Sequence, residues 1–394
     1  AENENNLLLK KILLQRLQEK PDIIWNDFLS WLFIQQNDFT AAFIQEKAIY
    51  ARQQVSLNPI FQLAELCEEN DQLNLAKQIY AYLISQSVEN NMRLTAEIGW
   101  LEIEVKLIKP NAYDTIEAKY NDLFSIYKQG TALAVLGLSY ANFLIDYRVK
   151  PSEAMQFLQE LMTSHSFKPF ELAQMRLLRG DAFVVMERFN EALVEYSKVQ
   201  IDLKNSTLAQ EARFKIAQTS FFKGDFEWAA SQLKVLKSST SQRIANDALV
   251  LKLLISDHTQ EDSLHLALKQ YAKAHLLRIQ GKDMAAIVLL DSILKNHKTE
   301  TIIAQTLLTQ AGLYAKNEQA ALARNNYLQL LQNYPDGLLA AEACYELGKI
   351  YLSSFDDKEN AMQYFEKLVF DYPSSIFFVE ARRRYRQLRG DDLN

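Results

Sequence analysis

The chain has 394 residues, a formal net charge of −6, and 48% hydrophobic and 23% charged residues. Its 10 glycines and 7 prolines are few for this length, which excludes a fold of many short strands and predicts an almost wholly helical protein. The acidic balance argues against a nucleic acid partner. No apolar run approaches the roughly 18 residues that a membrane-spanning helix needs.

The first residues also lack an apolar targeting segment, so we interpret Ala1 as a mature N-terminus or as a boundary within a longer chain. The two cysteines, Cys67 and Cys344, are far apart in the sequence. We expect both to be free thiols packed in the core, where cysteine behaves like a small apolar residue.

In chain order, a leucine-rich leading helix is predicted at 7–17 and ends at Pro21. Apolar residues at helical spacing then predict six helical hairpins, at 25–48, 60–83, 96–127, 131–162, 179–199 and 208–236. Single helices are predicted at 241–255 and 263–279; the second pairs with 286–293. Two further hairpins at 307–330 and 344–368 and a closing helix at 377–388 complete the chain.

The hairpin at 179–199 shows the pattern best. Ala192, Tyr196 and Val199 recur at i, i+4 and i+7, which places them on one face of a helix. Gly180 on the first helix and Ala192 on the second are small enough to let two helices approach closely. We therefore expect these two residues to form the contact between the paired helices.

Alanines of the second helices recur every 37 or 38 residues, from Ala154 to Ala229 and from Ala286 to Ala361. Between Ala229 and Ala286 the interval is 57 residues, longer than one hairpin by about one helix. The sequence therefore predicts a leading helix at 1–20, an N-terminal array at 21–240, an irregular helix or break at 241–262, and a C-terminal array with a closing helix at 263–394.

These units resemble tetratricopeptide repeats. Leu347-Gly348-x2-Tyr351 follows the first part of the family pattern, and Ala323, Tyr327, Leu330 and Pro335 follow the second. Trp25-x2-Phe28-Leu29-x2-Leu32 matches the first part loosely, and the period here exceeds the family's 34 residues. The resemblance implies an all-α fold, a right-handed α-solenoid superhelix of tetratricopeptide-like helical hairpins.

A narrower resemblance lies near the C-terminal end. Tyr334-Pro335 and Tyr372-Pro373 each precede a Glu-Ala pair, which is similar to the repeats of the outer-membrane assembly lipoprotein, the Tol–Pal coordinator family and long periplasmic repeat proteins of Bacteroidota. This resemblance implies a periplasmic scaffold or one associated peripherally with the outer membrane.

No constellation for catalysis is apparent. None of the five histidines pairs with another at the i, i+4 spacing of a helical zinc site, and there is no glycine-rich phosphate loop or nucleophile elbow. We expect no enzyme activity, no metal and no cofactor.

The first helix of each hairpin lines the inner groove of a tetratricopeptide array, so the resemblance implies a set of candidate peptide-binding residues. They are Asp181 and Val184, then Phe214, Gln218 and Phe222, and finally Tyr345, Glu346 and Lys349. The alternative is that Phe214 and Phe222 belong to the core between repeats. The lysine, asparagine and arginine set by which some family members hold a terminal carboxylate is not evident.

Basic residues also cluster on the closing helix, at Arg382, Arg383, Arg384 and Arg386. They form either a solvated helix face that complements the helix dipole or a docking patch for an acidic partner.

The sequence thus predicts a non-catalytic scaffold for protein partners of unknown identity in the periplasm or at the outer membrane. Two alternatives remain: a cytoplasmic adaptor of the same fold, and the non-catalytic part of an envelope enzyme complex. A glycan-binding role is less favoured.

Overall fold

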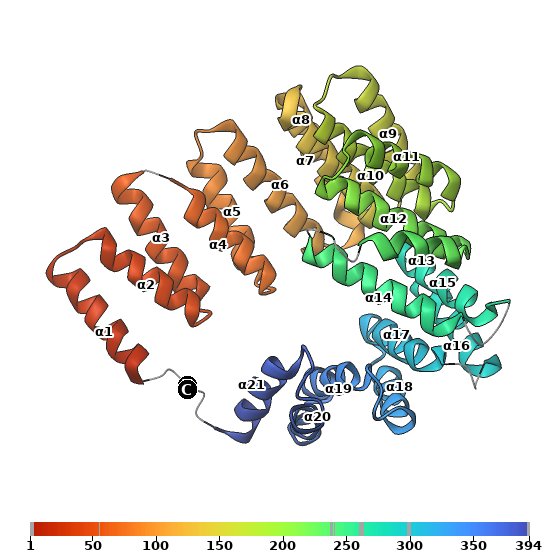
Figure 1. Cartoon of the computed structure of the whole chain (residues 1–394). Helices are drawn as coiled ribbons and strands as arrows, with labels where there is room; N and C mark the ends of the chain where they lie inside the picture. The colour runs from red at the N-terminus through yellow and green to blue at the C-terminus, as the bar shows by residue number, and fades with distance from the viewer. Residues whose placement is uncertain are drawn as a thin grey trace. The chain divides into compact units, whose positions relative to one another are not determined.

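The computed structural model describes residues 4–54, 56–236, 239, 241–259, 264–297 and 301–391. Within these ranges every regular element is helical, so the predicted all-α class is confirmed (Figure 1). Residues 1–3 of the predicted leading helix, 260–262 of the predicted break, and 263, 298–300 and 392–394 of the predicted C-terminal array lie outside the described residues. None of the described helices is long and apolar enough to cross a membrane.

The chain forms two compact units, residues 1–175 and 176–393, which divide within helix α10 (Pro169–Val185). The sequence placed its division at 241–262 instead. The described part of that segment is one helix, α14 (Gln242–His258), and it lies inside the second unit.

Unit 1 begins with helix α1, which spans nearly the whole predicted leading helix. Antiparallel helix pairs follow along the chain (Figure 1). The helices are α1 (Glu4–Glu19), α2 (Ile23–Gln35), α3 (Phe39–Gln53), α4 (Asn58–Glu69), α5 (Leu73–Gln86), α6 (Asn90–Leu107), α7 (Tyr113–Ile126), α8 (Gly130–Asn142) and α9 (Pro151–Ser164), with a 3₁₀ turn at Pro110–Ala112 and a π-helical turn at Phe143–Tyr147.

Helix α6 joins the two hydrophobic clusters of unit 1. Ala96 and Ile103 belong to the cluster built on α2 to α5. Leu94, Ile98 and Leu101, on another side of the same helix, belong to the cluster built on α7 and α8. A helix buried on two sides carries apolar residues around most of its circumference, as α6 does.

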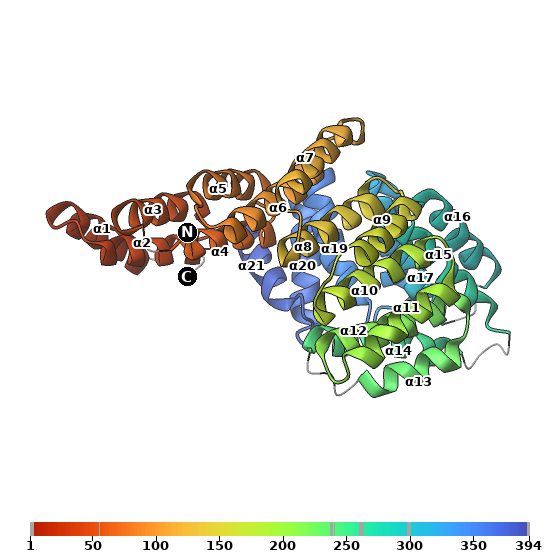
Figure 2. The same cartoon turned by 90° about the horizontal axis from the view of Figure 1, so that it is seen from above.

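Unit 2 continues the helix pairs, with helix α14 inserted between the pairs α12–α13 and α15–α16 (Figure 2). Its helices are the second half of α10, α11 (Phe189–Asp202), α12 (Thr207–Lys223), α13 (Phe226–Val235), α14, α15 (Leu266–Ile279), α16 (Asp283–Asn296), α17 (Ile302–Lys316), α18 (Ala320–Asn333), α19 (Ala340–Ser354), α20 (Lys358–Asp371) and α21 (Phe378–Arg389).

Helix α15 is held against the preceding repeats even though α14 comes between them in the sequence. Lys273 pairs with Glu187 at 2.6 Å, and the Gln280 side-chain amide donates to the Val185 carbonyl at 2.9 Å. The rings of His275 and Phe222 stack with centroids 5.9 Å apart. Because these contacts bypass α14, the inserted helix does not split the unit.

In two hairpins of unit 2, the close contact is between a glycine and an aromatic ring. An added Cβ at Gly180 would lie 2.7 Å from Cζ of Tyr196, and one at Gly348 would lie 2.6 Å from Cζ of Phe365. The sequence suggested Ala192 as the contact partner of Gly180. The atoms nearest to Gly180 instead belong to Tyr196, one helical turn after Ala192. Ala192 is fully buried beside this contact.

Both cysteines are free and buried, as predicted. Burial raises the pKa of Cys67 to about 11 and that of Cys344 to about 12, so both remain protonated thiols at neutral pH.

We predict that Gly180→Ala destabilises unit 2 by about 1–3 kcal/mol, because the new methyl group overlaps the Tyr196 ring in a well-packed core. Thermal unfolding followed by circular dichroism measures the change. Gly312→Ala is the matched control: this helical glycine has open space around it, so alanine should be neutral or stabilising by up to about 1 kcal/mol. Equal effects of the two changes would contradict the contact.

Candidate polypeptide-binding groove

A cavity of about 960 Å³ lies in unit 2 among α12, α14, α15, α17, α18 and α19, with Asp283 at the start of α16. We call it the α12–α19 groove. Four of the eight predicted groove residues line it, namely Phe214, Gln218, Phe222 and Glu346. The structure therefore brings residues of the sixth and ninth predicted hairpins to one site.

Aromatic rings form one side of the groove. Phe222 is only 8% exposed and stacks on His275, so it serves mainly as core, whereas Phe214 and Gln218 are half-buried. Burial, with a smaller effect of the neighbouring Arg278, lowers the pKa of His275 to about 4. His275 is therefore neutral at physiological pH, and this side of the groove is apolar.

Carboxylates dominate the charge of the groove. Glu342 and Glu346 lie one turn apart on α19, where burial and then the charge of Glu346 raise the pKa of Glu342. Glu346 accepts two hydrogen bonds of 3.0 Å from Lys349, but no described cation pairs with Glu342. The carboxylates that line the groove are Asp247, Asp283, Glu342 and Glu346, and the cations are Arg278 and Lys316. Lys316 pairs with Asp283 at 2.7 Å.

Two other predicted groove residues serve the hairpin itself. Asp181 accepts a hydrogen bond of 2.7 Å from the Tyr196 hydroxyl and two of 2.9 Å from the Lys215 ammonium. Val184 is buried in the core. Neither residue lines the α12–α19 groove.

The remaining predicted residues of α19 lie beside the groove and do not line it. Tyr345 stacks on Phe377 with ring centroids 4.9 Å apart, and Lys349 also approaches the Tyr345 ring. Lys349 therefore acts on the groove only through its ion pair with Glu346.

Local acids partly neutralise the basic cluster of α21. Arg383 and Arg384 both bond Glu380, at 2.7 and 2.8 Å, and Arg386 pairs with Asp391 at 3.6 Å. Arg382 is exposed. These local ion pairs are typical of a solvated helix face, the first interpretation given above. Docking of an acidic partner on this cluster stays a prediction.

Sequence reasoning missed the residues that α14, α15 and α17 contribute to the groove. Val250 of α14 is 68% exposed, Tyr271 of α15 is buried, and the Tyr271 hydroxyl and the Thr309 hydroxyl of α17 are 2.8 Å apart. All three line the groove. The 57-residue interval revealed the inserted helix, but no sequence signal showed which surface it would face.

Among the described residues, no group of three or more histidine, cysteine, aspartate or glutamate side chains is arranged to hold a metal ion.

We predict that Glu342→Gln stabilises the protein at neutral pH. The pKa of Glu342 is higher in the folded state than in the unfolded state, so the folded carboxyl binds its proton more tightly. The free energy of unfolding therefore falls as pH rises from the unfolded pKa to the folded pKa. The advantage of glutamine should be full above the folded pKa and vanish near pH 3, where glutamate is protonated in both states. Urea unfolding at pH 7.5 and pH 3 tests this. Glu65→Gln, at an exposed carboxyl of α4, is the control, and a wild-type advantage at pH 7.5 would contradict the prediction.

No protein-family model matches the chain, and no curated protein matches it. Among solved structures, it is similar to the TPR domain of P58(IPK), with 16% identity over 99% of both chains and a TM-score of 0.27. It is similar to the apo form of RapI, with 13% identity over 85% of this chain and 97% of that one and a TM-score of 0.38. A thermophilic TPR protein of Thermus thermophilus shares 19% identity over 55% of this chain and 98% of its own, with a TM-score of 0.24.

These likenesses concern the fold alone. The chain's own helix pairs form an all-α solenoid of helical hairpins. Arrays of this kind present extended concave surfaces on which partners can bind.

Proposed function

We propose that the chain is a non-catalytic scaffold that binds a polypeptide segment of a partner protein in the α12–α19 groove. The observation that carries this proposal is one cavity of about 960 Å³ that combines aromatic and aliphatic walls with an excess of carboxylates. Its volume lies in the range of sites that enclose a ligand of several side chains.

The two sides of the groove specify the chemistry of the segment. Apolar side chains of the partner would pack against Phe214, Val250 and Leu254, which line the groove without being fully buried. A lysine or arginine would approach Glu342, because its charge offsets both the desolvation of that carboxyl and the repulsion from Glu346. The preferred segment therefore carries a basic residue close to apolar ones.

A selection from a random peptide library on the immobilised protein tests this proposal. Selected peptides should be enriched in lysine or arginine near apolar residues. For such a peptide, the Glu342→Gln, Glu346→Gln double variant should bind about tenfold more weakly in fluorescence anisotropy, since a hydrogen bond to a charged group contributes about 1.5–3 kcal/mol. Replacing the basic residue of the peptide by norleucine should produce the same loss, and the two losses should not add.

The control for this experiment is Glu65→Gln, which removes one exposed carboxylate from unit 1. A peptide that binds the double variant and the wild type equally would exclude the acidic wall as its site. Val250→Asp then tests the apolar side of the groove. If this variant also binds the peptide with wild-type affinity, the groove is not the binding site. The double variant also removes the ion pair between Glu346 and Lys349, so its thermal midpoint is measured to show that it is folded when binding is compared.

We propose further that the scaffold works in the bacterial envelope, associated peripherally with the outer membrane. The Tyr-Pro and Glu-Ala junctions of the C-terminal repeats support this location by resemblance. Helix α1 adds a physical argument. Leu7 and Leu8 are 46% and 57% exposed beside Lys10 and Lys11, and apolar residues next to lysines are typical of helices that lie at a membrane interface.

Fractionation of the source cells tests the location. The protein should sediment with envelope membranes and be released by a wash at alkaline pH, which removes peripheral proteins, and Leu8→Glu should shift it to the soluble envelope fraction. Recovery of the wild type with cytoplasmic markers would overturn the envelope proposal while leaving the groove untouched.

A further inference from the structure

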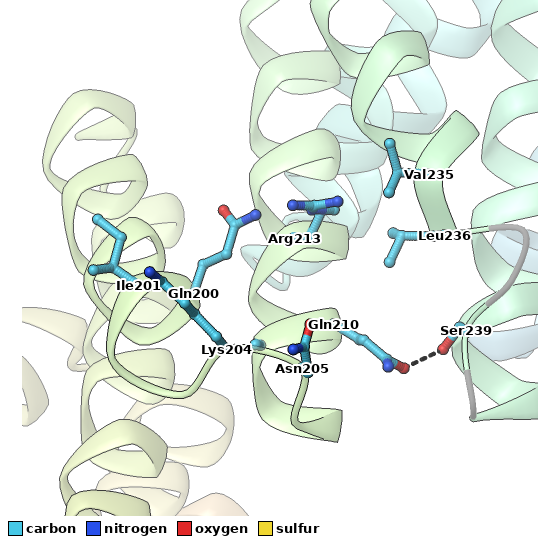
Figure 3. A pocket seen from close by; sticks show the side chains of 10 residues that line it. Gln200, Ile201, Lys204, Asn205, Gln210, Arg213, Val235, Leu236 and Ser239 are labelled. Carbon is cyan, nitrogen blue, oxygen red and sulfur yellow. Dashed lines mark hydrogen bonds between the residues drawn. The ribbon is translucent and has the colours of Figure 1, made fainter.

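A second cavity, of about 660 Å³, lies in unit 2 between the end of α11, the first half of α12 and the end of α13. We call it the α11–α13 cavity. Figure 3 shows Gln200 beside Arg213 on one wall, Asn205 beside Gln210 below them, and Val235 and Leu236 on the facing wall. It shares no lining residue with the α12–α19 groove.

Its charge is opposite to that of the groove. Arg213 and Lys204 line the cavity, and none of its described lining residues is a carboxylate. Arg213 is half-buried, and no described carboxylate pairs with it. The amide oxygen of Gln200, once it faces Arg213, accepts hydrogen bonds of 2.5 and 2.8 Å from Nη2 and Nε, so the described partner of the guanidinium is uncharged (Figure 3). A half-buried guanidinium normally finds an anionic partner, because its five donors match carboxylate and phosphate oxygens.

The cavity also exposes apolar surface that the fold does not cover. Ile201 and Val235 are 64% and 56% exposed, whereas Leu236 behind them is buried. All three line the same cavity as Arg213. The amides of Asn205 and Gln210 supply further polar groups, and the Ser239 hydroxyl already bonds Gln210.

We propose that the α11–α13 cavity binds a small organic oxyanion, a carboxylate or a phosphate monoester, that carries an apolar group. Its oxygens accept from the Arg213 guanidinium, and its apolar part covers Val235 and Ile201. Lys204 stands at the rim next to Ile201 in Figure 3, where its flexible ammonium adds a second positive charge. The volume of about 660 Å³ lies in the range of small-molecule sites. This inference is independent of the peptide groove.

Titration calorimetry with four probes tests the site. Phenyl phosphate and phenylacetate carry the two kinds of oxyanion on one apolar ring, inorganic phosphate lacks the ring, and phenylacetamide lacks the charge. The proposal expects at least one of the first two to bind, and the tighter of them identifies the oxyanion. That probe should bind about tenfold or more tightly than phenylacetamide, because a charged hydrogen bond is lost with the neutral compound. Inorganic phosphate should bind more weakly than phenyl phosphate.

Arg213→Gln should lower the affinity for the bound probe about tenfold or more. Arg213→Lys should have an intermediate affinity, because lysine keeps the positive charge but lacks the planar guanidinium with its paired donors. Lys358→Gln, which removes one exposed charge from α20, should leave binding unchanged. Equal binding of the tighter ring-bearing anion by wild type and Arg213→Gln would overturn the proposal, and so would equal binding of that anion and phenylacetamide. The absence of binding by both ring-bearing anions would overturn it as well. If the thermal midpoint shows that Arg213→Gln is unfolded, the exposed Lys204→Gln replaces it, and its full affinity would then count against the site.

Discussion

The contact of a glycine with a bulky ring inside a hairpin is the constraint on which the rest of this structure depends. Gly180 accepts the ring of Tyr196 where any Cβ would overlap it, and Gly348 accepts Phe365 in the same way. The contact fixes the distance between paired helices, and it leaves the tyrosine hydroxyl at the edge of the pair, where it donates to Asp181. Asp181 then binds Lys215 on the next hairpin, so one close contact also links neighbouring repeats.

The groove depends on a departure from this regularity. Helix α14 is inserted between two hairpins and packs against α13 and α12, and α15 also packs beside α12 through the Phe222–His275 stack. An inserted helix must bury some face, and α14 buries Ile244, Ala248 and Ile255 while Val250 stays exposed along the groove. Two hairpins, α15–α16 and α17–α18, separate α12 from α19 in the chain, in addition to α14. The inserted helix α14 adds its own lining residues to the groove, beside those of α12 and α19.

Periodicity in the sequence was sufficient to predict the helix pairs, because one apolar face per helix must be buried and the alanine interval counts the hairpins. It also named four of the residues that line the groove, since Phe214, Gln218, Phe222 and Glu346 lie on the first helices of their hairpins. It failed for Asp181 and Val184, since a residue can occupy an inner position and still be used by a hydrogen bond or by the core. It could not predict Tyr271 or Thr309, because their place depends on how α15 passes the inserted helix, a long-range contact without a local signal.

Helix α12 shows how one element serves two surfaces of opposite charge. Gln210 and Arg213 in its N-terminal half line the α11–α13 cavity, and Gln218 and Phe222 in its C-terminal half line the α12–α19 groove. The partial positive charge of a helix N-terminus favours an anion near the first pair, and the partial negative charge of its C-terminus favours a cation near the second. The side chains and the backbone of α12 thus point to the same two partners. Since both surfaces share this helix, a ligand that shifted it in one cavity would alter the other.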